Sequence, residues 1–82
     1  MSQTVEMTAE LPGTFYTRES PGSEPYVSVG ATVSVGDTVG LIEVMKMFNP
    51  VVSTVAGTVV EVCVEAEDSV DVGDVLLRVE VS

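Results

Sequence analysis

The 82-residue sequence contains no histidine, one cysteine and only three basic residues against 13 carboxylates. Without histidine, and with Cys63 alone, it offers no zinc ligand set and no Ser-His or Cys-His nucleophile pair. A single cysteine also excludes an intrachain disulfide framework, which favours a reducing cytoplasm. We therefore expect neither catalysis by this chain nor a metal site.

The charge and the hydropathy pattern exclude further classes of protein. A formal net charge of −10 opposes binding to nucleic acid or to an anionic membrane. No apolar stretch approaches the roughly 20 residues that a membrane span requires. Residues 1–4 lack the basic and apolar regions of a signal peptide. We expect a cytoplasmic protein that contacts neither nucleic acid nor membrane.

Short valine-rich segments separated by glycine, aspartate and proline dominate the chain. Valine occupies 19 of the 82 positions, and no window sustains the apolar spacing of an amphipathic helix. This pattern predicts one all-β domain over residues 1–82. The expected strands lie near residues 4–9, 13–17, 26–29, 39–45, 47–53, 57–64, 69–72 and 75–81.

An internal repeat divides the chain into halves. Residues 33–39, Val-Ser-Val-Gly-Asp-Thr-Val, recur 37 positions later as Val-Asp-Val-Gly-Asp-Val-Leu, whereas Gly13-Thr14 recurs at an offset of 44. The difference places seven extra residues in the first half, in the Pro/Gly/Ser-rich stretch 18–25. We expect two four-stranded units that pack face to face as a sandwich, with an insertion that is either disordered or functional.

The only lysine, Lys46, lies at the crossover between these halves, between two methionines. An exposed turn usually carries polar residues, so the run Glu43-Val44-Met45-Lys46-Met47 is unusual. If Met45 and Lys46 occupy a two-residue hairpin turn, both require positive φ, at a cost of about 1–2 kcal/mol each. A solvated surface lysine and methionines packed in a core are the ordinary alternatives.

The run at residues 43–47 resembles the Glu-Ala-Met-Lys-Met motif of biotin carboxyl carrier domains, with Val44 in place of alanine. The match to the bacterial acetyl-CoA carboxylase type extends to Asn49, and further matches are residues 13–16, 33–38, 57–59 and 79–80. The resemblance implies a flattened β-barrel, or barrel-sandwich hybrid, of two four-stranded antiparallel sheets with pseudo-two-fold symmetry. It also implies a thumb at about residues 17–27.

The same resemblance implies a function. Biotin would be joined by an amide to Lys46, and biotin protein ligase would read Met45 and Met47. Glu43 matches the acidic residue of the motif, although a solvated strand residue explains it equally well. The carrier would take a carboxyl group from biotin carboxylase to carboxyltransferase. These two partner enzymes would perform the chemistry.

Two other functions remain open at this stage. A lipoyl carrier shares the fold and a hairpin lysine, but usually has aspartate before the lysine and a small residue after it. An unmodified β-domain for protein binding would leave the single lysine unexplained.

Overall fold

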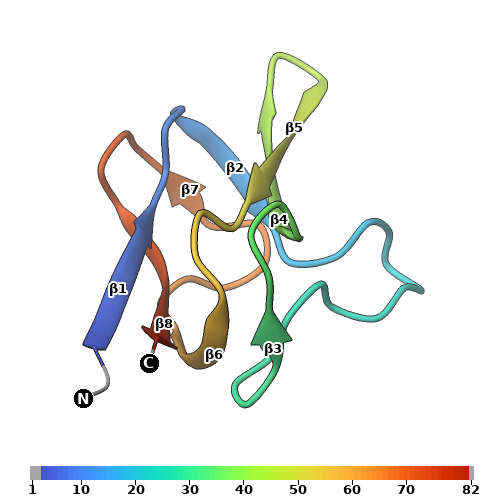
Figure 1. The fold of residues 1–82 in the computed structure, drawn as a ribbon. Helices are drawn as coiled ribbons and strands as arrows, with labels where there is room; N and C mark the ends of the chain where they lie inside the picture. The colour runs from blue at the N-terminus through green and yellow to red at the C-terminus, as the bar shows by residue number, and fades with distance from the viewer. Residues whose placement is uncertain (1–2, 82) are drawn as a thin grey trace.

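The computed structural model describes residues 3–81, which form eight strands in two four-stranded antiparallel sheets (Figure 1). The predicted all-β barrel-sandwich is confirmed. Residues 1–2 and 82, which the expected domain includes, lie outside the described part. The strands are β1 (Gln3–Thr8), β2 (Gly13–Tyr16), β3 (Thr32–Val33), β4 (Thr38–Val44), β5 (Met47–Val52), β6 (Gly57–Val62), β7 (Ser69–Val70) and β8 (Val75–Val81).

The two halves of the repeat interleave. One sheet has the order β1-β8-β6-β3 and the other β5-β4-β2-β7, so each sheet takes two strands from each half. The expectation that each half forms one sheet is therefore wrong. The long strands β4 and β8 each pair with partners from both halves, so backbone hydrogen bonds join the two halves within each sheet.

The repeat is visible in matching turns. Gly36 and Gly73 have φ of 92° and 93°, a region that glycine enters without steric penalty. After each glycine, an aspartate accepts a hydrogen bond from the backbone N–H three residues earlier: Asp37 Oδ2 from Ser34 N, and Asp74 Oδ2 from Asp71 N. The predicted equivalence of the two Gly-Asp turns is confirmed.

The strand expected at residues 26–29 is absent, and β3 forms at Thr32–Val33 instead. The reason is local: Tyr26 N donates to Thr17 O at the base of the insertion, and a turn at 28–31 follows, with φ of 96° at Gly30. The strand expected over 57–64 ends at Val62, so Cys63 lies just beyond it.

The insertion is an ordered protrusion. Arg18 bridges to Pro25, the Arg18 guanidinium donates to Ser23 O, and the hydroxyls of Ser20 and Ser23 share a hydrogen bond of 2.7 Å. It projects sideways from the end of β2 (Figure 1).

The core lies between the sheets and receives side chains from both halves. Strand alternation turns the apolar residues inward, and both sheets contribute to one cluster. Its most enclosed side chains are Phe15, Ile42, Leu76, Leu77, Val33, Val39, Val59 and Val79.

Candidate functional site at the β4–β5 hairpin

The hairpin between β4 and β5 has a two-residue turn formed by Met45 and Lys46. Val44 pairs with Met47 directly across it. Met45 has φ of 50° and Lys46 has φ of 68°. Both values are positive, as the predicted type I′ geometry requires. Neither residue is glycine or asparagine, so the turn adopts its conformation against local preference.

The turn of the hairpin lies at the end of the molecule opposite both termini (Figure 1). Met45 is 91% exposed, Met47 is 70% exposed, and Lys46 is also exposed. The alternative that these methionines belong to the core is therefore wrong. Within residues 3–81, the ion pairs involve Arg78 and no carboxylate pairs with Lys46, so its amine is open to a reagent.

Glu43 is tied to a neighbouring strand. Tyr16 Oη donates a hydrogen bond of 3.0 Å to Glu43 Oε1, and Glu43 faces Phe48 across the hairpin. The rings of Tyr16 and Phe48 lie 5.5 Å apart with a tilt of 57°. The hydrogen bond to Glu43 raises the pKa of the Tyr16 phenol, with smaller contributions from burial and from the charges of Glu43 and Glu67. This contact restrains one side of the hairpin.

Asn49 braces the other side. Its Nδ2 donates to Ile42 O and to Met47 O, both at 3.3 Å, and so joins the two hairpin strands. Tyr16, Phe48 and Asn49 were not predicted as site residues from the sequence. All three lie in the segments that match the carrier family, residues 13–16 and 43–49, which was the one available signal.

The protrusion follows β2, and the hairpin turn lies at the far end of β4. Tyr16, the last residue of β2, pairs with Leu41, three residues before Val44. The side chains of residues 18–25 form hydrogen bonds with other residues of the protrusion, from Arg18 to Ser23 O and between Ser20 and Ser23. In this structure the protrusion and the turn are therefore held independently.

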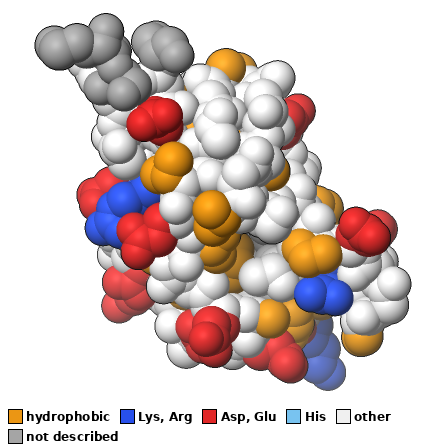
Figure 2. All heavy atoms as spheres, turned by 90° about the horizontal axis from the view of Figure 1, so that it is seen from below, with side chains coloured by type: hydrophobic (Ala, Val, Ile, Leu, Met, Phe, Trp, Pro, Cys, Tyr) orange, Lys and Arg blue, Asp and Glu red, His pale blue; other side chains and the backbone are white. Residues whose placement is uncertain are grey.

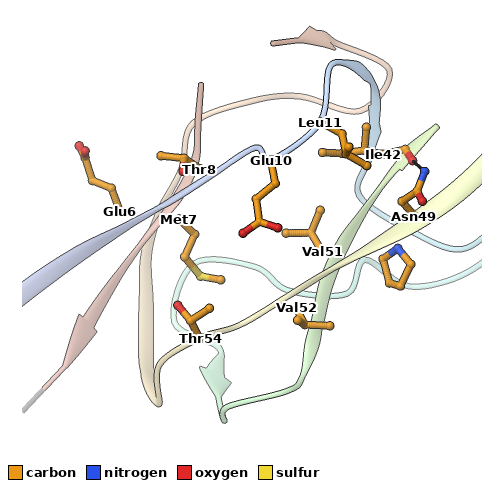
Figure 3. Close-up of a pocket in the computed structure, with 11 residues that line it drawn as sticks. Glu6, Met7, Thr8, Glu10, Leu11, Ile42, Asn49, Val51, Val52 and Thr54 are labelled. Carbon is orange, nitrogen blue, oxygen red and sulfur yellow. Dashed lines mark hydrogen bonds between the residues drawn. The ribbon is translucent and has the colours of Figure 1, made fainter. Parts of the chain in front are cut away.

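A cleft of about 240 Å³ opens between the β1–β2 connection and β5 (Figure 3). Glu10 points into it from one side and Val51 lies on the other. Leu11 and Asn49 also line an apolar hollow beneath the turn. The cleft is smaller than most small-molecule sites, which occupy about 300–1,000 Å³.

Acidic side chains are spread round the end of the molecule opposite the hairpin, and basic ones are few (Figure 2). Within residues 3–81, no group of three histidine, cysteine, aspartate or glutamate side chains is arranged to hold a metal ion. Over the same residues, no helix has the length and apolar character needed to cross a membrane.

Comparison with known proteins gives one consistent family. The model of the biotin/lipoyl family described as "Biotin-requiring enzyme" matches residues 5–79. The biotin carboxyl carrier protein of acetyl-CoA carboxylase from Porphyra purpurea is 36% identical over 74 residues, 90% of this chain and 47% of that protein. The protein of the same name from Streptococcus pyogenes is 39% identical over 70 residues, 85% of this chain and 42% of that protein.

A solved structure shares the fold. The crystal structure of Kluyveromyces lactis urea carboxylase superposes with a TM-score of 0.76 at 27% identity, covering 94% of this chain and 6% of that one. The chain spans about half the length of the first curated relatives that it matches.

Proposed function

Because this chain belongs to the family of biotin-requiring enzymes, we propose that it is a carrier domain that bears biotin on Lys46. The observation that carries this proposal is the turn itself. The only lysine stands at the apex of a two-residue hairpin, exposed, flanked by exposed methionines and free of any described ion pair. A single lysine side chain gives an enzyme that modifies lysine one possible target.

The residues of the site fit covalent attachment of biotin. Lys46 would hold biotin through an amide between its amine and the biotin carboxyl group. A ligase would first activate that carboxyl with ATP, and AMP would leave as the amide forms. The formal charge of −10 would become more negative by one unit. When bound, biotin supplies a ureido nitrogen that accepts and releases a carboxyl group. The lysine side chain gives the group reach.

The chain itself holds the hairpin that carries Lys46 in a fixed position. The Tyr16–Glu43 hydrogen bond and the Asn49 brace hold the two strands below the turn. A rigid base with a flexible arm keeps the attached group near its partners and raises its effective concentration there. The domain is therefore a non-catalytic component, since it offers attachment and orientation while its partners perform the reactions.

The partners follow from this role and from the names of the relatives. We propose biotin protein ligase, biotin carboxylase and carboxyltransferase, with acetyl-CoA as the acyl acceptor. The formal charge of −10 supports protein partners over nucleic acid and anionic membranes. The single cysteine supports a cytoplasmic location.

Roles for the flanking residues are part of the proposal. Met45 and Met47 present flexible apolar side chains at the turn, which suits recognition by the ligase. Glu43 acts through Tyr16, as a residue that positions the hairpin. The protrusion at about 17–27 acts as a thumb that limits the movement of the biotin group.

The test is attachment to a single position. Purified protein incubated with biotin protein ligase, ATP and biotin gains the mass of one biotin, and the Lys46→Arg variant gains none. Peptide mapping then locates the group on Lys46. Biotin on the arginine variant, or a lipoyl mass on protein purified from cells, would overturn the assignment.

A further inference from the structure

The pseudo-two-fold symmetry allows the outer faces of the two sheets to be compared row by row. Glu6, Arg78 and Glu61 face one another across β1, β8 and β6. The equivalent row across β5, β4 and β2 is Pro50, Leu41 and Tyr16. The strand order of the two sheets is equivalent, although β6 carries a bulge between Val59 and Glu61 that β2 lacks, and the rows differ in their side chains.

The outer face of the β1-β8-β6-β3 sheet is polar and internally paired. Arg78 forms ion pairs with Glu6 and with Glu61, and the next row is Thr4, Glu80 and Thr58. Such a surface is well solvated, and it satisfies its main charges within the protein.

The outer face of the other sheet is apolar along its edge strand β5, whereas Glu43 and Thr14 beside Phe48 match Glu80 and Thr58 beside Thr4. Phe48 is 55% exposed and Val52 is 45% exposed on β5, with Pro50 exposed between them. Leu41 and Tyr16 continue the surface inward, half-buried. We call these five residues the apolar face. Contiguous apolar surface of this kind usually marks a contact site for another protein.

The position of the apolar face indicates which kind of protein binds to it. Phe48 lies two residues from Lys46 on the same hairpin, so the face is continuous with the proposed attachment site. An enzyme that acts on the lysine amine must approach the hairpin closely, because the lysine side chain is only a few bonds long. An enzyme that acts at the far end of the biotin arm can remain further away.

We propose that the apolar face is the docking surface for biotin protein ligase, an inference that rests on the proposed function. A complementary surface on the ligase would be apolar at its centre and basic at its rim. The basic rim complements Glu43, the one carboxylate in the row beside Phe48, and the formal charge of −10. Phe48 is the expected anchor, because exposed aromatic residues dominate interface energies.

Side chains rather than backbone form the contact. β5 is an edge strand, but Pro50 lies within it and has no N–H to offer. Extension of the sheet by a strand of the ligase is therefore interrupted at Pro50. The side chains of Phe48 and Val52 remain available on either side.

The test replaces the apolar face with the residues found at the equivalent positions of the other sheet. Thr4 and Thr8 correspond to Phe48 and Val52, so the variant is Phe48→Thr with Val52→Thr. The matched control is Val29→Thr with Val60→Thr, which removes two exposed valines, 65% and 40% exposed, outside the hairpin and its sheet. Initial rates of biotin incorporation give kcat and KM for each protein, and thermal melts verify that both remain folded.

The hairpin variant is expected to lose at least tenfold in kcat/KM for the ligase, mainly through KM, while the control stays within twofold of wild type. Equal rates for the two variants would overturn the docking proposal. Unchanged ligation with slower carboxylation would overturn it too, and would assign the face to biotin carboxylase. If the wild type self-associates and the hairpin variant does not, while ligation is unchanged, the face is assigned to a second copy of the chain.

Failure of the docking proposal is distinguishable from failure of the proposed function. If the wild type gains no biotin on Lys46, the carrier function itself is wrong. If the wild type is modified normally and the hairpin variant is modified equally well, only the docking surface is wrong.

Discussion

Tyr16 donates a hydrogen bond of 3.0 Å to Glu43 Oε1, although the two residues are 27 positions apart. Tyr16 ends β2 and Glu43 lies near the end of β4, beside the Lys46 turn. The contact fastens the strand that carries the turn to its neighbour in the sheet. A negatively charged acceptor favours the protonated phenol, and this raises the pKa of Tyr16.

We expect Glu43→Gln to lower the pKa of Tyr16 towards its ordinary value. Titration of phenolate absorbance in a Tyr26→Phe background isolates the Tyr16 signal. In wild type, the folded state keeps its proton at a pH where the unfolded chain has begun to lose it. The stabilisation from Tyr16 is therefore complete below the unfolded pKa and is lost as pH rises through the higher folded pKa. An unchanged titration curve in Glu43→Gln would show that the carboxylate is not the cause.

Because Met45 has positive φ, a substitution at this position is expected to raise the stability of the protein and to lower biotin incorporation. Met45→Asn is expected to stabilise the protein by about 1 kcal/mol, because asparagine tolerates positive φ at the first position of such a turn. For a domain of this size that is a rise in Tm of about 4–8 °C. Biotin incorporation is expected to fall, because the exposed methionine flank is lost.

Glu67 provides the comparison, because it also has positive φ, 69°, in a turn outside the β4–β5 hairpin, although its charge reaches Tyr16. Glu67→Asn is expected to raise Tm by a similar amount and to leave biotin incorporation unchanged. Equal incorporation by Met45→Asn and wild type would show that the ligase does not read this methionine. A fall in Tm would show that the turn is not strained.

Gly57 marks a place where the two strands leave no room for a side chain. A Cβ at this position would meet the backbone oxygen of Glu80, and Gly13 has the equivalent relation to the backbone oxygen of Glu43. We expect Gly57→Ala to destabilise the fold by about 1–3 kcal/mol, measured by urea unfolding. Gly22→Ala is the control, because a Cβ there meets nothing within 4 Å.

The protrusion can be tested by removal. Replacing residues 18–25 with a short glycine-containing turn is expected to preserve the fold, because the core cluster lies outside this segment and loop length affects closure entropy only slightly. Biotin incorporation at Lys46 is expected to persist. Carboxylation through a reconstituted carboxylase is expected to fall, because the biotin group loses a surface that orients it. Full carboxylation by the shortened protein would make the protrusion a passive loop.

The sequence by itself determined the fold class, the hairpin turn and the location of the insertion. These depend on local properties: valine-rich segments favour strands, Gly-Asp pairs form turns, and seven extra residues change the repeat offset whatever the tertiary structure. The two-residue turn at Met45 and Lys46 follows equally from local rules, because so short a connection allows few backbone conformations.

Tertiary structure alone decided which strands share a sheet and which side chains meet. Two similar halves can pack as separate sheets or interleave, and only the pairing of β4 and β8 with both halves selects the second arrangement. The strand expected at 26–29 gave way to β3 because backbone groups near Tyr26 found partners at the base of the protrusion. The Tyr16–Glu43 contact and the apolar face both depend on register between distant strands, and register is fixed by burial of one face of each sheet rather than by neighbouring residues.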